Sequence, residues 1–435
     1  MNHARLGVPV AACAFTCLAA MAAGQGSPHP SRAAERQAPA QTVEELVAAA
    51  LERSASVAAL RERLAAAREM VGPSGAIPDP SVELMLQDVG FPSWTVGAQE
   101  MSMIGPEVRQ ELPFPGKRAA RRGVADAEAS ARAAELDQVR REVAMQVRVL
   151  YGRVWALDRE RQHLDASREM LEMLSVTAAS RYAVGESNQE AVLKAQLELS
   201  RLAERIDDVA ADRAARVAAL NRLLDREGAA PVGPALELPK PEAPPLPWEE
   251  QAVRSSPEVT VRRASVAAAE KRVTVARLDL KPDFTTGAAV GLRGGFDPTV
   301  TLRFGVTYPF WKKEKQEPLV RVAQDELAMA RAELRDAEAS ARSAAARLAA
   351  EWQRTNRQIE RYREAIVPQS SAAVDAARAN YLAGRGDFLT VVDDFNRWLS
   401  ARIELALREA DRFVTWAEIE ALIAPPDGQH ATKEN

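Results

Sequence analysis

Two halves of this 435-residue chain carry the same ordered markers about 200 residues apart. The recurring markers are Pro78-Asp79 with Pro282-Asp283, Pro113-Phe114 with Pro309-Phe310, Trp155 with Trp352, and Tyr182 and Gly185 with Tyr381 and Gly384. Markers that keep their order and nearly constant spacing indicate one ancestral unit duplicated in tandem. Any function of the chain must therefore use both halves.

Shifts in composition divide the chain into six segments. We expect a signal peptide over 1–22, a leader over 23–41, a first repeat over 42–228, a proline-rich linker over 229–247, a second repeat over 248–424 and a tail over 425–435. Each repeat is expected to contain a helix, two strands and a long helical hairpin. The leader and the tail have the low complexity of disordered segments.

The N-terminus has the pattern of a secretory signal. Arg5 precedes an apolar stretch from Leu6 to Leu18, and Ala20-Met21-Ala22 fits an A-x-A cleavage site. Both cysteines, Cys13 and Cys17, lie in this stretch, so the exported chain is expected to have neither a disulfide nor a thiol metal site. Val10-Ala11-Ala12-Cys13 also resembles a lipobox, which leaves lipidation at Cys13 open as the alternative.

Composition and motifs exclude several function classes. A net charge of −4 gives no global basic field, which argues against nucleic acid as a partner. The histidines of the exported chain, His29, His163 and His430, are isolated, and we expect His163 at the surface of a helix. Without an H-E-x-x-H motif or a glycine-rich phosphate loop, the chain is expected to be no enzyme and to bind no metal or cofactor.

Long stretches without proline predict long helices. Residues 43–71 are expected to form one helix, and residues 117–180 predict a continuous helix of about 64 residues, about 95 Å long. The second repeat has the same stretch over 318–380, where Pro368 predicts a kink or break. Each long helix meets a short glycine-containing turn and returns, which predicts antiparallel helical hairpins with exposed tips.

Alternating apolar and polar residues predict two pairs of strands. Residues 82–88 and 101–112 form the first pair, in which Gly105-Pro106 suggests a bulge or a strand edge. Residues 284–292 and 300–308 form the second pair, with a turn from Gly294-Gly295 to Pro298. One face is apolar and the other is small or polar, which fits either a soluble hairpin under the chain's own helices or a sheet facing lipid.

A single chain has too few helices and strands to complete the structure that its predicted elements require. Apolar positions in the first long helix step by three and four, at Leu136, Val139, Val143, Val147, Leu150, Val154 and Leu157. Such a narrow stripe needs other helices to cover it. Four strands are also too few to close a membrane barrel, since the smallest known have about eight. Both deficits predict a homo-oligomer, and three copies supply twelve strands and a ring of hairpins.

A family resemblance rests on the junctions between strands and helices. The first reads Gln110-Glu111-Leu112-Pro113-Phe114-Pro115-Gly116-Lys117-Arg118, the second reads Thr307-Tyr308-Pro309-Phe310-Trp311-Lys312-Lys313, and both hairpin turns contain Tyr-x-x-Gly. With these features, residues 43–423 resemble TolC-type outer-membrane efflux proteins and, among them, the CzcC and CusC branch that serves metal-exporting pumps. The resemblance implies a mainly α fold with a small membrane β-barrel.

The resemblance also implies an assembly and its partners. Each protomer would contribute four strands and its long helical hairpins to a homotrimer, with a twelve-stranded barrel in the outer membrane and an α-helical tunnel in the periplasm. The implied partners are a periplasmic adaptor (membrane fusion) protein, an inner-membrane RND-type pump and outer-membrane lipid.

Three groups of candidate site residues follow from the turns, the junctions and the resemblance. The adaptor-docking tips comprise Tyr182, Val184, Gly185, Glu186, Tyr381, Ala383, Gly384 and Arg385. The periplasmic aperture, where the family places acidic residues, comprises Asp387, Asp393 and Asp394. The membrane-interface junction comprises Phe114, Lys117, Arg118, Phe310, Trp311, Lys312 and Lys313.

Each group has a simpler structural interpretation. Gly185 and Gly384 fit left-handed helix C-caps, which is compatible with docking at the same turns. The aperture acids would repel each other and attract cations if three subunits brought them together, but an ordinary solvated helix face explains them equally well. Cations in the first turns of a helix oppose its dipole, so lipid phosphates would compensate them at a membrane face. A solvated basic turn is the alternative.

The expected function is that of the outer membrane channel in a tripartite efflux system, conducting metal cations passively across the periplasm and outer membrane. A channel for drug efflux or type I secretion is the alternative, and a periplasmic coiled-coil adaptor or scaffold is a more distant one. An adaptor would have one hairpin per chain and substantial β-rich domains. The sequence leaves the cargo, the particular pump and adaptor, and the state of the aperture undetermined.

Overall fold

The structure is a computed structural model that describes residues 41–90, 96, 99–235, 237–239, 242 and 247–423. All of these residues belong to one compact unit, Pro39–Asn435. The expected signal peptide, Cys13 and the tail lie outside the described residues.

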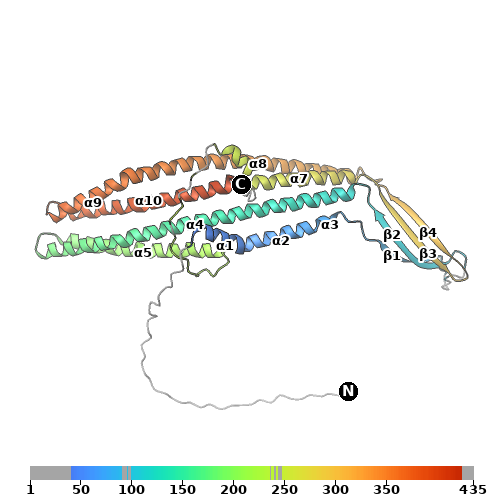
Figure 1. The fold of residues 1–435 in the computed structure, drawn as a ribbon, viewed down its shortest axis with the longest axis horizontal. Coiled ribbons are helices and arrows are strands. Elements are labelled where there is room, and N and C mark those ends of the chain that lie inside the picture. Colours follow the sequence, from blue (N-terminus) through green and yellow to red (C-terminus); the bar gives the residue numbers. More distant parts are fainter. Residues whose placement is uncertain are drawn as a thin grey trace, which may run out of the picture. The chain divides into compact units, whose positions relative to one another are not determined.

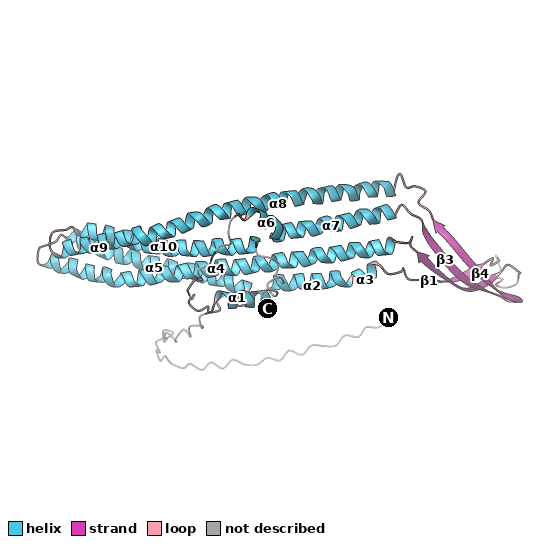
Figure 2. Cartoon of the chain, turned by 45° about the horizontal axis from the view of Figure 1, so that its top comes forward, coloured by secondary structure: helices cyan, strands magenta, loops and turns pink. Residues whose placement is uncertain are grey.

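Helices form most of the described chain and run side by side, with the strands beyond one end and the hairpin turns at the other (Figures 1 and 2). The helices are α1 (Val43–Arg53), α2 (Ala55–Glu69), α3 (Val71–Ser74), α4 (Lys117–Ala183), α5 (Gln189–Leu223), α6 (Glu249–Ser255), α7 (Pro257–Leu278), α8 (Gln316–Arg361), η1 (Tyr362–Ile366), α9 (Val367–Leu382) and α10 (Phe388–Ile423). The expected long helix after the first junction is confirmed by α4, which has 67 residues. Within the described residues, no helix combines the length and the apolarity that a membrane span requires.

The first helix differs from the single helix expected over residues 43–71. Ser54 ends α1 and begins α2, with a non-helical ψ of 123°. The second repeat has the same break, where Ser256 separates α6 from α7 with a ψ of 128°. Serine at these positions does not interrupt the apolar pattern, which is why periodicity alone predicts one helix. Ser54 and Ser256 are therefore a further pair of repeat markers.

The interruption expected at Pro368 takes the form of a π-helical turn. The turn η1 (Tyr362–Ile366) joins α8 to α9, and Pro368 is the second residue of α9. A proline has no N–H to bond the carbonyl four residues earlier, and its ring crowds that carbonyl. A π turn widens the helix at this point, so the chain continues into α9 without a connecting loop.

The described strands form one antiparallel sheet in the order β1-β2-β3-β4. The strands are β1 (Ser81–Gln87), β2 (Met103–Leu112), β3 (Asp283–Arg293) and β4 (Phe296–Thr307). The pairing of β2 with β3 joins the two repeats, with Glu111 opposite Thr285. Gly105-Pro106 lies in the inner strand β2 and not at an edge, and the β2–β3 pairing skips these two residues. The edge strands of the sheet are β1 and β4.

The helix α4 connects the packing of the two repeats. It contacts α5 of its own hairpin and both α7 and α10 of the second repeat. Near the middle of the helices, Val147 of α4, Leu220 of α5 and Phe413 of α10 share one apolar core with α1. Toward the hairpin turns, a second core joins Leu171 of α4 to Phe395 of α10. The two hairpins are therefore packed against each other along most of α4.

Candidate functional site

Both hairpin turns end their long helices with the same hydrogen-bond motif. In the first, the N–H of Gly185 donates to the carbonyl of Tyr182, and the N–H of Glu186 donates to that of Arg181 at 2.8 Å. In the second, Gly384 donates to Tyr381 and Arg385 to Asn380 at 2.9 Å. These are Schellman motifs, in which a left-handed glycine follows the helix. Gly185 has φ +78° and Gly384 has φ +71°, so both glycines serve as the expected caps.

Most of the expected docking residues are exposed at the turns. Val184 is 71% exposed and Tyr182 is 48% exposed, and a side-chain atom added at Gly185 would meet nothing within 4 Å. Glu186, Ala383, Gly384 and Arg385 are exposed as well. Tyr381 differs, because it is only 3% exposed and packs edge-on against Phe388. It supports the turn from inside and offers no surface to a partner.

Arg181 connects the two turns. Its guanidinium donates a hydrogen bond from Nη1 to the carbonyl of Tyr381 and lies 5.0 Å from the centre of the Tyr381 ring. The same side chain approaches Glu186 of its own turn at 3.6 Å. The relative position of the two turns is therefore set within one chain. Sequence reasoning missed Arg181, since only the fold brings it to the second hairpin.

The aperture candidates lie at the start of α10 next to the second turn. Asp387 precedes α10 and is exposed. Asp393 and Asp394 both face Arg397, at 2.8 Å and 3.6 Å. Asp393 also lines a shallow groove with Lys194 of α5. Within one chain, then, the charges of Asp393 and Asp394 are partly compensated by an arginine one turn further along the helix.

The first junction is held by an ion pair between repeats. Lys117 at the start of α4 is buried, and its ammonium donates to Asp283 at 2.8 Å and to the carbonyl of Lys281 at 3.0 Å. The backbone N–H of Phe114 donates to the other carboxylate oxygen of Asp283 at 2.7 Å. The expectation that lipid compensates this cation is therefore wrong for Lys117, because β3 supplies the carboxylate. Arg118 is exposed and donates to the carbonyl of Gly75.

The second junction is more exposed than the first. Phe310 is 79% exposed and Trp311 is 74% exposed, and Phe310 packs edge-on against Tyr308 with ring centres 5.0 Å apart. Lys312 and Lys313 follow directly and are exposed. Aromatic rings next to lysines are the side chains that proteins place at the boundary between lipid and water.

The two faces of the sheet have opposite character. The strand register places on one face Val82, Leu84, Leu86, Val108, Val290, Leu292, Val300, Leu302, Phe304 and Val306. All of these side chains are exposed, and Phe304 reaches 83%. The described helices leave this apolar face uncovered, contrary to the alternative of a half-buried soluble hairpin. An apolar face of this extent requires a partner or lipid.

The other face carries a charged cluster whose members come from three strands, β1, β2 and β4. Glu107 of β2 accepts hydrogen bonds from Arg303 of β4 at 2.6 and 2.7 Å and from Arg109 at 3.2 Å, while Arg109 also approaches Glu83 of β1. Gly287 and Ala289 of the intervening β3 leave room for the contact between β2 and β4. The charged residues on the polar face of the alternating pattern could have indicated this cluster from sequence.

Comparison with known proteins identifies the family. A family model described as outer membrane efflux protein matches residues 46–226 and 248–424, which is most of the chain. This chain belongs to the outer membrane efflux protein family. Proteins of this family are transport components and not enzymes. Among the described residues, no group of three or more His, Cys, Asp or Glu side chains is placed to hold a metal ion.

Solved structures share the fold of this outer membrane efflux protein. The outer membrane protein VceC from Vibrio cholerae is 18% identical, with a TM-score of 0.74 over 88% of this chain and 96% of VceC. The outer-membrane channel OprN is 18% identical, with a TM-score of 0.76 over 88% and 89%. CusC is 14% identical, with a TM-score of 0.76 over 89% and 93%. No curated protein sequence matches significantly. The expected fold class, long helical hairpins with a small antiparallel sheet, is confirmed.

Proposed function

We propose that this protein is the outer membrane channel of a tripartite efflux system and works as a homotrimer. The observation that carries this proposal is the sheet, whose apolar face is exposed while its other face holds the Glu107 cluster. In the described sheet, the edge strands β1 and β4 each pair on one side only. Pairing β4 of one copy with β1 of the next would close three sheets into a twelve-stranded barrel with the apolar face toward lipid.

The junctions and turns indicate how the protein would be oriented, with the sheet in the membrane and the helices extending away from it. Phe310, Trp311, Lys312 and Lys313 would lie at the periplasmic boundary of the membrane, where lysines meet lipid phosphates. The helices would then continue into the periplasm as a tunnel. The exposed turns at Val184 and Ala383, at the far end, would dock a periplasmic adaptor that links the channel to an inner-membrane pump. Asp387, Asp393 and Asp394 would line the opening there.

We infer metal cations as the cargo class from the junction residues that resemble the CzcC and CusC branch. The fold itself does not favour one cargo, because the TM-scores to VceC, OprN and CusC are nearly equal. A passive conduit also needs no tight metal site, since strong binding would slow passage. A drug-exporting channel remains the second candidate, and export assays in cells lacking the channel separate the two by which toxic cargo the protein clears.

Assembly and conduction test the proposal. Detergent-extracted protein should be a trimer by light scattering, and it should produce discrete conductance steps in a planar lipid bilayer.

A substitution at the first hairpin turn distinguishes a docking role from a folding role: Gly185→Trp should abolish export and adaptor binding while the trimer persists. Gly185→Asn is the matched control, because asparagine tolerates the left-handed backbone. A protein that stays monomeric without detergent would refute the channel, and loss of the trimer in Gly185→Trp would make the turn purely structural.

A further inference from the structure

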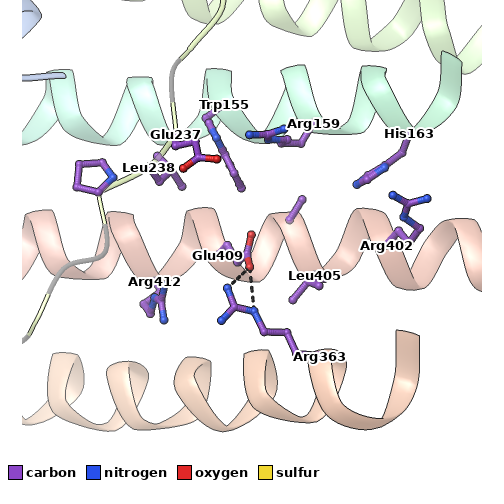
Figure 3. Close-up of a pocket in the computed structure, with 12 residues that line it drawn as sticks. Trp155, Arg159, His163, Glu237, Leu238, Arg363, Arg402, Leu405, Glu409 and Arg412 are labelled. Atoms are coloured by element: carbon purple, nitrogen blue, oxygen red, sulfur yellow. Dashed lines mark hydrogen bonds and ion pairs between the residues drawn. The ribbon is translucent and has the colours of Figure 1, made fainter. Parts of the chain in front are cut away.

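A cavity of about 300 Å³ lies between α4 and α10, beneath the chain segment that connects the two repeats (Figure 3). Trp155, Arg159 and His163 line it from α4, while Arg402, Glu409 and Arg412 line it from α10. Arg363 of η1 and Glu237 of the connecting segment complete its charged wall. Its size is at the lower end of the range for small-molecule sites. None of these residues belongs to the turns, the junctions or the sheet.

The charges around the cavity do not balance. Four arginines face two glutamates, and one glutamate, Glu409, already pairs with Arg363. No carboxylate among the described residues lies within ion-pair distance of Arg159, Arg402 or Arg412. Arg159 instead lies over the ring of Trp155, at 5.3 Å from its centre. Arg159 also donates a hydrogen bond from Nη1 to Oε1 of Gln162 at 3.0 Å, which is an uncharged acceptor. The wall therefore presents three guanidinium charges that no carboxylate of the described residues neutralises.

Two hydrogen-bond donors in the wall are buried and lack a partner within the described residues. The indole Nε1–H of Trp155 is one, and Trp155 is only 6% exposed. The Nε–H of Arg412 is the other. Trp155 extends from α4 toward α10 across the cavity (Figure 3). A buried donor without an acceptor costs free energy, so a cavity that gathers several such donors is built for a ligand rich in acceptors.

His163 contributes to the same charge pattern. Burial, together with Arg402 and Arg159, lowers the pKa of His163 to about 4, so its imidazole is neutral at pH 7. Burial and Arg363 also lower the pKa of Arg412, while Glu409 opposes this effect. Burial is the largest cause of both shifts, and the neighbouring arginines act in the same direction. An anion in the cavity would relieve this repulsion.

We propose that this cavity binds a small oxyanion, held by Arg159, Arg402 and Arg412 with the Trp155 indole as a fourth donor. Guanidinium groups suit this ligand because they present paired N–H donors to phosphate or carboxylate oxygens. The walls on both sides come from one chain, so the site does not depend on the trimer. Binding would join α4 of the first hairpin to α10 of the second near the middle of the helices.

Calorimetry on the purified full-length protein in detergent tests this site. Inorganic phosphate, pyrophosphate and citrate are titrated separately, and at least one should bind with one site per chain. Arg402→Gln should weaken that binding about tenfold, because it removes one charge-assisted contact. Arg201→Gln is the matched control, since Arg201 is an exposed arginine of α5 that pairs with Glu198 and does not line this cavity. Its binding should equal that of the unmodified protein.

The comparison among anions identifies the chemistry. Tighter binding of pyrophosphate assigns a phosphate-bearing ligand, and tighter binding of citrate assigns a carboxylate.

Trp155→Phe is a second variant, needed if Arg402→Gln fails to fold. It keeps the ring packing and removes the unpaired N–H, so it should also weaken binding. The proposal is overturned if none of the three anions binds, which would also be the result if a neighbouring subunit filled the cavity. It is equally overturned if both variants fold and bind the anion as tightly as the unmodified protein.

Discussion

The guanidinium of Arg181, near the end of α4, donates a hydrogen bond to the backbone carbonyl of Tyr381 in α9. The contact joins the two hairpin turns of one chain at the end of the helices where we propose that an adaptor docks. Tyr381 is buried against Phe388 beneath this contact, so the turns share a small core. Any movement of one turn away from the other must break this contact first.

Replacing Arg181 should loosen the second turn. Arg181→Gln removes a charge-assisted hydrogen bond worth about 1.5–3 kcal/mol, reduced by its partial exposure, and a cation–π contact. Hydrogen–deuterium exchange should therefore increase at the end of α9 and the start of α10. Arg168→Gln, an exposed arginine on the same helix, is the control. Equal exchange in the two variants would show that the contact does not hold the turn.

The ion pair of Lys117 and Asp283 predicts that removing one of its charges destabilises the protein more than removing both. Asp283→Asn leaves the buried ammonium with the carbonyl of Lys281 and with Asp279 at 3.7 Å as its nearest carboxylate. It should destabilise the protein by about 1–3 kcal/mol, less than the loss of a fully buried pair because Asp283 is partly exposed. Lys117→Met with Asp283→Asn removes both charges and should recover part of the loss. Thermal dissociation of the assembly in detergent measures both. A double variant less stable than Asp283→Asn would contradict this account.

The Glu107 cluster predicts how charge affects conduction, if its face lines the pore as proposed. Glu107→Gln leaves Arg303 and Arg109 without their shared carboxylate and should shift selectivity toward anions by about two- to threefold. Arg303→Gln should shift it toward cations. Reversal potentials in salt gradients across a planar bilayer report both changes. Conductance with unchanged selectivity would place the cluster away from the ion path, whereas absence of conductance would refute the channel itself.

The lowered pKa of His163 predicts a loss of stability in acid. The unfolded chain binds a proton near pH 6.5 and the folded chain only near about 4, so stability from this group is complete above 6.5 and falls as pH decreases through that window. After allowance for partial exposure, the loss is about 1–2 kcal/mol. His163→Gln should reduce the difference in dissociation temperature between pH 7 and pH 4.5. A difference of equal size in the variant would show that other groups cause it.

The alternation of β3 and β4, the proline-free stretch of α4 and the glycines of the two turns are local patterns, and each predicts its element from neighbouring residues alone. The start of β4 is the exception, because the strand begins at Phe296 and includes Pro298, which the sequence predicts to lie in the turn. Ser54, by contrast, breaks a helix without breaking its apolar period, so the break is visible only in the fold. The sequence predicts lipid as the partner of Lys117, because nothing in it places Asp283 beside that residue. Tyr381 matches Tyr182 as a repeat marker, yet one ring is buried and the other exposed.

The amino-acid sequence alone determined the repeat, the long helix α4 and the faces of the strands, since these follow from marker spacing and from periodicities of two and 3.6 residues along the chain. Tertiary structure decided which distant side chains meet. The contacts of Arg181 with Tyr381, Lys117 with Asp283, Glu107 with Arg303 and Trp155 with the arginine cavity all cross between repeats or strands. They depend on how α4 packs against the second repeat and on strand register, and these are set by the whole core.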